Sequence, residues 1–161
     1  MRKLIIMTFS LFTSVLSFGQ VPDSTKKVDT VYLKINEINN HWLYDEIKSQ
    51  GVVFPDIVFG QALLESGNFK SNVFKENNNL FGMRLPKVRK TTAIGKNRGY
   101  AKYENWVQSV GDYLLWQQSI PKKYLKSREN YFYYLQKYYC TSPHYQSRVK
   151  RTIKEHKQHL N

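Results

Sequence analysis

Two short stretches dominate this sequence: Gln61-Ala62-Leu63-Leu64-Glu65-Ser66-Gly67 and, after a short loop, Asn77-Asn78-Asn79-Leu80-Phe81-Gly82. Pro55 suits the first turn of a helix and Gly67 suits a left-handed cap at its end, so a helix is predicted between them. Glu65 then lies on the last turn, where the negative end of the helix dipole and the flanking leucines both raise the pKa of its carboxyl. A carboxyl that keeps its proton can act as a general acid. The competing interpretation is a solvated side chain at a helix end, the usual situation for a glutamate.

The composition allows one domain. The chain has 161 residues, 41% hydrophobic and 15% aromatic, which is enough for a folded globule with a modest core. Its N-terminus carries Arg2 and Lys3, an apolar run to Phe18 and a small residue at Gly19, which is the pattern of an export signal. We expect a signal peptide at 1–19, a short polar leader at 20–35 and the domain at 36–161.

The same N-terminal pattern predicts an exported protein, located in the periplasm, outside the cell or on the cell wall. The apolar run is too short for a convincing membrane span, so we expect no stable membrane insertion after cleavage. An uncleaved anchor is the alternative.

The formal charge of +13 predicts an anionic partner. Nucleic acid, acidic lipids and a carboxylate-bearing cell wall would all meet this requirement. Basic residues are spread from Lys26 to Lys157 with a late cluster beginning at Arg148, and no compact nucleic-acid motif appears. With an export signal present, wall polyanions are favoured and no nucleic-acid partner is expected.

Metal and thiol chemistry are not indicated. Cys140 is the only cysteine, so no intramolecular disulfide can form, and an isolated cysteine is more often a small buried hydrophobe than a nucleophile. The histidines lack a spacing with acids or cysteines that would close a metal shell; they are His41, His144, His156 and His159. We therefore expect no metal site and no cofactor.

Apolar periodicity predicts about five helices and one small β element. The helices are expected at 35–50, at 55–67, from 106 to just before Pro121, from Ser127 onward, and from Ser142 and Pro143 to the C-terminus. Asn105 with Gln108 resembles a capping box for the third of these. Residues 87–103 lose the helical period and have the composition of a short β-hairpin or an extended loop, which would form the second wall of a cleft.

The two stretches resemble the signature of bacterial glucosaminidases of glycoside hydrolase family 73. In that family Glu-Ser-Gly is joined by a short loop to Asn-Leu-Phe-Gly, and the glutamate matching Glu65 is the catalytic acid. Tyr100-Ala101-Lys102-Tyr103 resembles the family's aromatic-x-x-Tyr segment, and 138–145 resembles a diverged Gly-Tyr-Ala-Thr-x-Pro-x-Tyr stretch. The resemblance spans about residues 36 to 156. It implies a two-lobed lysozyme-like fold of the α+β class, mainly α-helical, with a small β-hairpin lobe.

The activity that the resemblance implies is hydrolysis of peptidoglycan by an endo-β-N-acetylglucosaminidase, an autolysin acting as a monomer on glycan strands. Two alternatives remain open. One is a muramidase or lytic transglycosylase on the same fold, although the Gly-Leu-Met-Gln type segment of those relatives is absent. The other is a catalytically silent wall-binding module.

The second catalytic group is not evident from the sequence. Most glycosidases use two carboxyl groups, and many family members carry the second in the β lobe, but residues 87–103 contain no acid. Glu104, Asp112 or Glu76 could approach the cleft instead, or the substrate's own N-acetyl group could act as the nucleophile. We favour the last, because substrate assistance is an established exception to the two-carboxylate scheme.

The resemblance also suggests residues that contact the sugar. Tyr103, with Glu104 beside it, is a candidate catalytic residue, and Tyr103 or Tyr139 could orient the acetamido group or the attacking water. Substrate contacts are expected from the following residues: Gln61, Asn79, Phe81, Gly82 and Tyr139. Their competing interpretation is structural, since tyrosine is a common core residue and Asn79 to Gly82 could simply build a tight turn.

Overall fold

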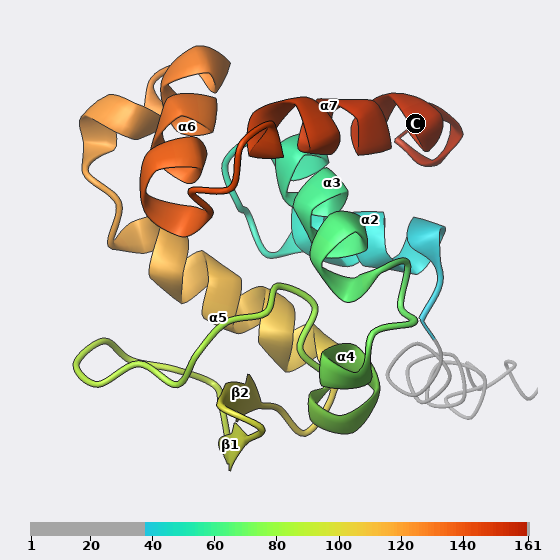
Figure 1. Ribbon diagram of the computed structural model, residues 1–161, viewed down its shortest axis with the longest axis vertical. Coiled ribbons are helices and arrows are strands. Elements are labelled where there is room, and N and C mark those ends of the chain that lie inside the picture. Colours follow the sequence, from blue (N-terminus) through green and yellow to red (C-terminus); the bar gives the residue numbers. More distant parts are fainter. Residues whose placement is uncertain (1–37, 161) are drawn as a thin grey trace, which may run out of the picture.

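A computed structural model describes residues 38–160 of the chain; the expected signal peptide and leader lie outside the described residues. The α-helices are α2 (Asn40–Ser49), α3 (Pro55–Ser66), α4 (Asn72–Asn77), α5 (Trp106–Gln118), α6 (Arg128–Tyr134) and α7 (Tyr145–Glu155). The strands are β1 (Gly95–Asn97) and β2 (Tyr100–Lys102), and short 3-10 turns cover Lys122–Leu125 and Lys157–His159. Figure 1 shows α2, α3, α6 and α7 on one side of α5, with α4 and the hairpin on the other.

The central helix is α3. Pro55 is at its start and Gly67 caps its end with φ +59°, as the sequence predicts. Its apolar side chains point in several directions and supply two core clusters, Ile57 to the one beside α6 and α7, and Phe59 and Ala62 to the one beside α2 and α5. A helix that is apolar on all sides is expected to be buried, and α3 is enclosed in this way.

The small lobe consists of α4, the hairpin and the long loop between Gly82 and β1 (Figure 1). The two strands pair antiparallel, with Lys96 opposite Ala101. This confirms the expected hairpin within residues 87–103. The sequence analysis missed α4, because a helix of 6 residues is too short to show a period.

Helix caps were predicted with mixed success. Asn105 accepts a hydrogen bond from the Gln108 amide at the start of α5, and Ser127 accepts one from Asn130 at the start of α6. Both predictions are confirmed. The start of α7 was predicted wrongly, because His144, with φ +65°, precedes the helix and Pro143 stays outside it.

Taken together, these elements confirm the expected α+β class, mainly helical with one small hairpin. None of the helices within residues 38–160 is long and apolar enough to cross a membrane.

The contact between α3 and α7 leaves no room for a side chain at Gly60. A Cβ there would lie 2.6 Å from Ile153 Cγ1 and 3.3 Å from the Val149 carbonyl oxygen. Gly60→Ala should therefore push α7 away and lower the free energy of unfolding by about 1–3 kcal/mol, as measured by urea denaturation.

Gly111 in α5 provides the matched control. A Cβ there meets its nearest atoms at 3.4 and 3.5 Å, which is ordinary contact. Gly111→Ala should raise the free energy of unfolding by about 0.5–1 kcal/mol, the helix preference of alanine over glycine. Equal stabilities of the two variants would contradict the close packing of α3 on α7.

Candidate active site

A pocket of about 470 Å³ opens where the end of α3 meets the loop after Phe81 and the turn that follows α6. Its lining comes from both lobes. The lining residues are Glu65, Phe81, Gly82, Met83, Arg84, Leu85, Pro86, Arg89, Trp116, Tyr138, Tyr139 and Cys140. Four predicted site residues are therefore brought together here: Glu65, Phe81, Gly82 and Tyr139.

Glu65 is half-buried on the last turn of α3, as the sequence predicts. Burial raises the pKa of its carboxyl, and this effect outweighs a hydrogen bond with Tyr145 and the positive charge of Arg148, which both act to lower it. Glu65 thus combines access to the pocket with a pKa raised above its ordinary value, two properties that suit a general acid.

The turn after α4 brings the backbone close to this carboxyl. Gly82 has φ +62°, and a Cβ there would lie 3.8 Å from Glu65 Oε2. A side chain at this position would be strained and would fill the space in front of the carboxyl, so glycine keeps the entrance to Glu65 open.

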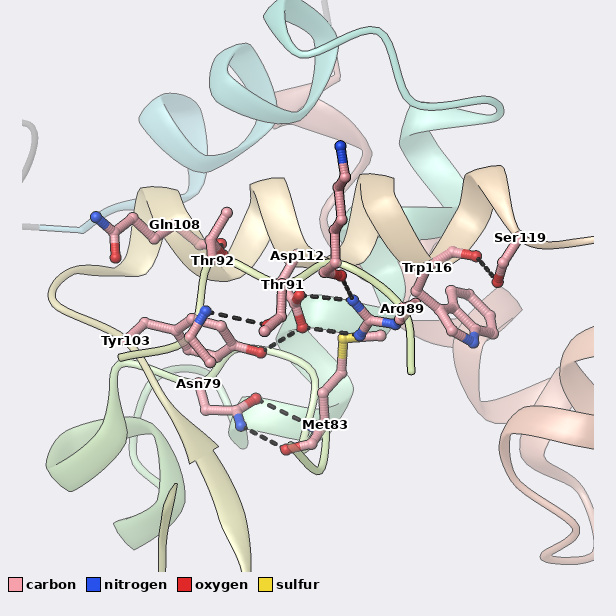
Figure 2. A network of polar contacts seen from close by, with 12 residues as sticks. Asn79, Met83, Arg89, Thr91, Thr92, Tyr103, Gln108, Asp112, Trp116 and Ser119 are labelled. Atoms are coloured by element: carbon pink, nitrogen blue, oxygen red, sulfur yellow. Dashed lines mark hydrogen bonds and ion pairs between the residues drawn. The ribbon is translucent and has the colours of Figure 1, made fainter. Parts of the chain in front are cut away.

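Asn79 holds this turn in place from inside. Its side chain is 1% exposed; the amide nitrogen donates to the Met83 carbonyl at 2.9 Å and the amide oxygen accepts from the Met83 N–H (Figure 2). The same nitrogen also donates to the Ala101 carbonyl at 2.8 Å. All its hydrogen bonds go to the backbone. The structure gives Asn79 the turn-building role and keeps it out of the pocket lining.

Gln61 is also buried, one turn before Glu65 on α3. Its amide nitrogen donates to the Tyr145 hydroxyl at 3.0 Å, and its amide oxygen accepts from the Tyr113 hydroxyl. Since the Tyr145 oxygen already accepts from Gln61, its own proton is free to point to Glu65, with which it is hydrogen-bonded. Gln61 does not line the pocket; it orients Tyr145, which in turn holds the Glu65 carboxyl.

Tyr139 connects the two lobes across the pocket. It belongs to a π turn at Leu135–Tyr139 that follows α6, and its hydroxyl donates to the Phe81 carbonyl at 2.5 Å. Its ring contacts Trp116 edge-on, with centroids 5.2 Å apart. Burial raises the pKa of this phenol well above its ordinary value, so it remains a neutral donor.

Tyr103 lies behind the pocket wall and does not line it. It is fully buried and its hydroxyl donates to Asp112 at 2.8 Å, while Arg89 forms a two-pronged ion pair with the same carboxylate at 2.7 and 2.9 Å (Figure 2). Burial acts to raise the pKa of Asp112, but Arg89, Thr91 and Tyr103 outweigh it and hold that pKa below its ordinary value. This network ties the long loop to α5 and so fixes the wall that carries Arg89.

The other candidate carboxylates do not reach the pocket. Glu104 is exposed and accepts a hydrogen bond from Gln108, and Glu76 is paired with Arg98 in the small lobe. Asp112 is fully buried and occupied by Arg89. Among the residues that line the pocket, Glu65 is the only carboxylate.

The part of the chain between residues 38 and 160 offers no set of side chains that could bind a metal ion together. Within 38–160, His, Cys, Asp and Glu side chains form no group of three or more that could hold an ion.

Sequence reasoning missed several residues of the site. Tyr145 was not proposed as a site residue and Arg89 was not considered. Trp116 and Tyr138 were not assigned to the cleft. Tyr138 and Tyr145 both lie within the stretch that matches the family's C-terminal motif, which was the one available signal.

Three comparisons with known proteins bear on this arrangement. A glucosaminidase family model, described as mannosyl-glycoprotein endo-beta-N-acetylglucosaminidase, matches residues 41–158. Protein bax of Escherichia coli (strain K12) is 38% identical over 63 residues, which are 39% of this chain and 23% of that protein, so the match spans less than a quarter of its length. The crystal structure of the catalytic domain of the autolysin Auto from Listeria monocytogenes is similar with a TM-score of 0.49 and 18% identity, covering 89% of this chain and 91% of that one. Because the family model covers well over half of its residues, the chain belongs to the glucosaminidase family.

Proposed function

We propose that this protein is a peptidoglycan hydrolase that cleaves the β-1,4 bond after N-acetylglucosamine, with Glu65 as the general acid. The observation that carries the proposal is the environment of Glu65. Its carboxyl is half-buried, has a pKa raised by burial and lies 3.8 Å from the position that a side chain at Gly82 would occupy, inside a pocket lined from both lobes. Membership in the glucosaminidase family supports the same assignment.

In the first step the protonated Glu65 donates its proton to the glycosidic oxygen as the bond to the anomeric carbon breaks. The Tyr145 hydroxyl, oriented by Gln61, donates to the carboxylate that is left behind and stabilises it. The developing positive charge on the sugar then needs a nucleophile or a negative charge nearby.

The pocket lining offers no second carboxylate to act as this nucleophile, so we assign that role to the substrate. Glu65 is the only carboxylate among the lining residues, which also include the two cations Arg84 and Arg89. We propose that the carbonyl oxygen of the substrate's N-acetyl group attacks the anomeric carbon and forms a cyclic oxazolinium ion. Water then opens this ring with Glu65 acting as the base, which regenerates the carboxylic acid and the acetamido group.

The charge of the chain supports the choice of substrate. A formal charge of +13 favours a polyanionic surface, and the stem peptides of peptidoglycan carry carboxylates. The family suggests an exported protein, and we propose that it works as a monomer held on the wall by this charge.

Replacement of the acid tests the proposal directly. Glu65→Gln should lower the rate of peptidoglycan digestion about 10²- to 10⁴-fold, because an amide is far too weak an acid to transfer a proton to the glycosidic oxygen. Mass spectrometry of the products should identify new reducing N-acetylglucosamine ends. Reducing MurNAc or anhydro-MurNAc ends would instead indicate a muramidase or a lytic transglycosylase, and binding without cleavage by the parent chain would indicate a silent module.

Glu104→Gln is the matched control for the second carboxylate. Because Glu104 is exposed and lies outside the pocket lining, the variant should digest peptidoglycan within about twofold of the parent rate, as expected of a surface change. A loss of rate as large as that of Glu65→Gln would contradict the substrate-assisted step and indicate that Glu104 takes part in catalysis.

Substrate assistance predicts the stereochemistry. Two displacements at the anomeric carbon should give products that first appear with the β configuration of the substrate, as observed by proton NMR during digestion. A thiazoline analogue of the cyclic intermediate should inhibit, and glycan strands without N-acetyl groups should resist cleavage. Initial α products would overturn the substrate-assisted step while leaving Glu65 as the acid.

The pH dependence should follow the Glu65 carboxyl. Its raised pKa keeps the acid form present to higher pH than for an ordinary glutamate, and the rate should fall as the pH rises through that pKa. Arg148 is exposed and its charge lowers the pKa, so Arg148→Gln should move this limb of the kcat profile to higher pH. The shift should shrink at high salt, which screens exposed charges.

Arg151→Gln is the control for this shift. It removes the same charge from α7 at an exposed position paired with Glu155, and it should leave the limb in place. Identical shifts in the two variants would mean that the net charge of the protein, rather than the charge near Glu65, governs the profile.

A further inference from the structure

A group of tyrosine rings continues from the pocket over the neighbouring surface. Tyr138 lines the pocket and is 53% exposed, and Tyr133 of α6 is equally exposed. Tyr124 lies between them, stacked on Tyr133 at 6.1 Å and edge-on to Tyr138 at 6.2 Å. Tyr134 packs on Tyr138 at 4.8 Å and contacts the lining residue Trp116 at 6.1 Å. We call Tyr124, Tyr133, Tyr134 and Tyr138 the tyrosine platform.

Two lysines border these rings. The Lys137 ammonium lies 5.7 Å from the centre of the Tyr133 ring and 5.2 Å from that of Tyr138, and the Lys123 ammonium lies 4.9 Å from the Tyr124 ring. Neither lysine forms an ion pair with a carboxylate of residues 38–160. Their charges therefore remain available to an anionic ligand next to the rings.

Exposed aromatic rings gathered in one place are uncommon on a soluble protein and mark binding surfaces. Tyrosine suits this use, because it offers a large flat apolar face with few rotatable bonds and a hydroxyl that can hydrogen-bond at its edge. The chain collects these rings from three successive elements, namely the 3-10 turn at Lys122–Leu125, α6 and the π turn at Leu135–Tyr139. The π turn belongs to the platform through Tyr138 and to the pocket through Tyr139.

We propose that the tyrosine platform is a distal subsite that binds the glycan strand beyond the sugars held at Glu65. The proposal extends the proposed function and rests on it for the identity of the polymer. A pyranose ring has an apolar C–H face that packs on an aromatic face, while its hydroxyl and acetamido groups project from the edge, where phenol hydroxyls can pair with them. Where a MurNAc residue carries no stem peptide, its free lactyl carboxylate would pair with Lys123 or Lys137.

Two observations favour a glycan strand over other occupants. The platform is continuous with the pocket through Tyr138 and Trp116, so a linear polymer bound in the pocket can extend over it. The combination of flat aromatic faces with bordering ammonium groups also matches an amino-sugar polymer that carries carboxylates. A second copy of the chain would bring the same lysines against each other.

The test measures how binding depends on ligand length in the full chain carrying Glu65→Gln, which should bind without cleaving. Isothermal calorimetry compares chitobiose, which is short enough for the pocket, with chitohexaose, which extends beyond it. Tyr133→Ala should weaken chitohexaose binding about three- to tenfold, the effect of losing one ring contact, and should leave chitobiose binding unchanged. Tyr133→Phe keeps the ring and should retain most of the affinity for both.

Tyr133 suits this test because it does not line the pocket and is largely exposed, so its loss should not disturb the fold. Unchanged chitohexaose binding in Tyr133→Ala would overturn the proposal. Equal losses for both oligosaccharides would also overturn it, since the ring would then act through the pocket. Sedimentation of the same samples reports on self-association, and a dimer that Tyr133→Ala dissociates would assign the platform to a subunit interface instead.

The carboxylate contacts have their own test. Lys137→Gln should weaken binding of glycan strands that retain MurNAc and are freed of stem peptides, and it should leave binding of uncharged chitohexaose unchanged. The difference should vanish at high salt. If Lys137→Gln and its parent bind the MurNAc strands with equal affinity, Lys137 is not part of the subsite.

Failure of this inference is distinguishable from failure of the proposed function. Cleavage is measured with Glu65 present, and the platform is measured by binding with Glu65→Gln. A chain that binds long oligosaccharides through Tyr133 but yields no new reducing ends would keep the platform and lose the hydrolase assignment. If the parent chain cleaves peptidoglycan but Tyr133→Ala binds long and short oligosaccharides as the parent does, the hydrolase assignment would stand and the platform would be lost.

Discussion

The structure depends on the burial of α3. The helix is apolar on nearly every side, so it is enclosed by α2, α5, α6 and α7, and it approaches α7 so closely that Gly60 has no room for a methyl group. Its last turn therefore cannot move out into water, and Glu65 is held where the protein excludes part of its hydration. Desolvation of that carboxyl is the main cause of its raised pKa. The chemistry proposed for the pocket follows from this constraint.

The surroundings of Glu65 are built from neutral hydrogen bonds. Gln61 links Tyr145 to Tyr113, and Tyr113 is in turn paired with Tyr131, so the groups behind the acid are amides and phenols. A fixed cation in their place would lower the pKa of Glu65 and remove its proton. The buried ion pair near the pocket, Arg89 with Asp112, largely compensates its own charges and uses them to hold the wall loop. The charged pair thus holds the wall loop, whereas neutral groups hold the Glu65 carboxyl.

Local signals were sufficient for much of the fold. Pro55, Gly67, Asn105 and Ser127 mark helix ends through interactions with residues at most a few positions away, and the structure has those ends where they were predicted. The sequence analysis missed α4, because 6 residues are too few for a period, and the start of α7 was misplaced because His144 adopts a left-handed conformation that no local rule required. Glu65 was proposed as the acid from its place at the end of an apolar helix together with the family resemblance.

The sequence by itself determined most of the elements, the place of Glu65 at the end of an apolar helix and the family signature, because each of these is encoded in residues close together along the chain. Only the tertiary structure decided which side chains share the pocket with Glu65. Gln61, Asn79 and Tyr103 match the signature yet are buried behind the wall, whereas Arg89 and Trp116 carry no local signal and line it. The physical reason is that a side chain reaches the pocket only if the packing of distant elements leaves it exposed there, and that packing is a property of the whole core.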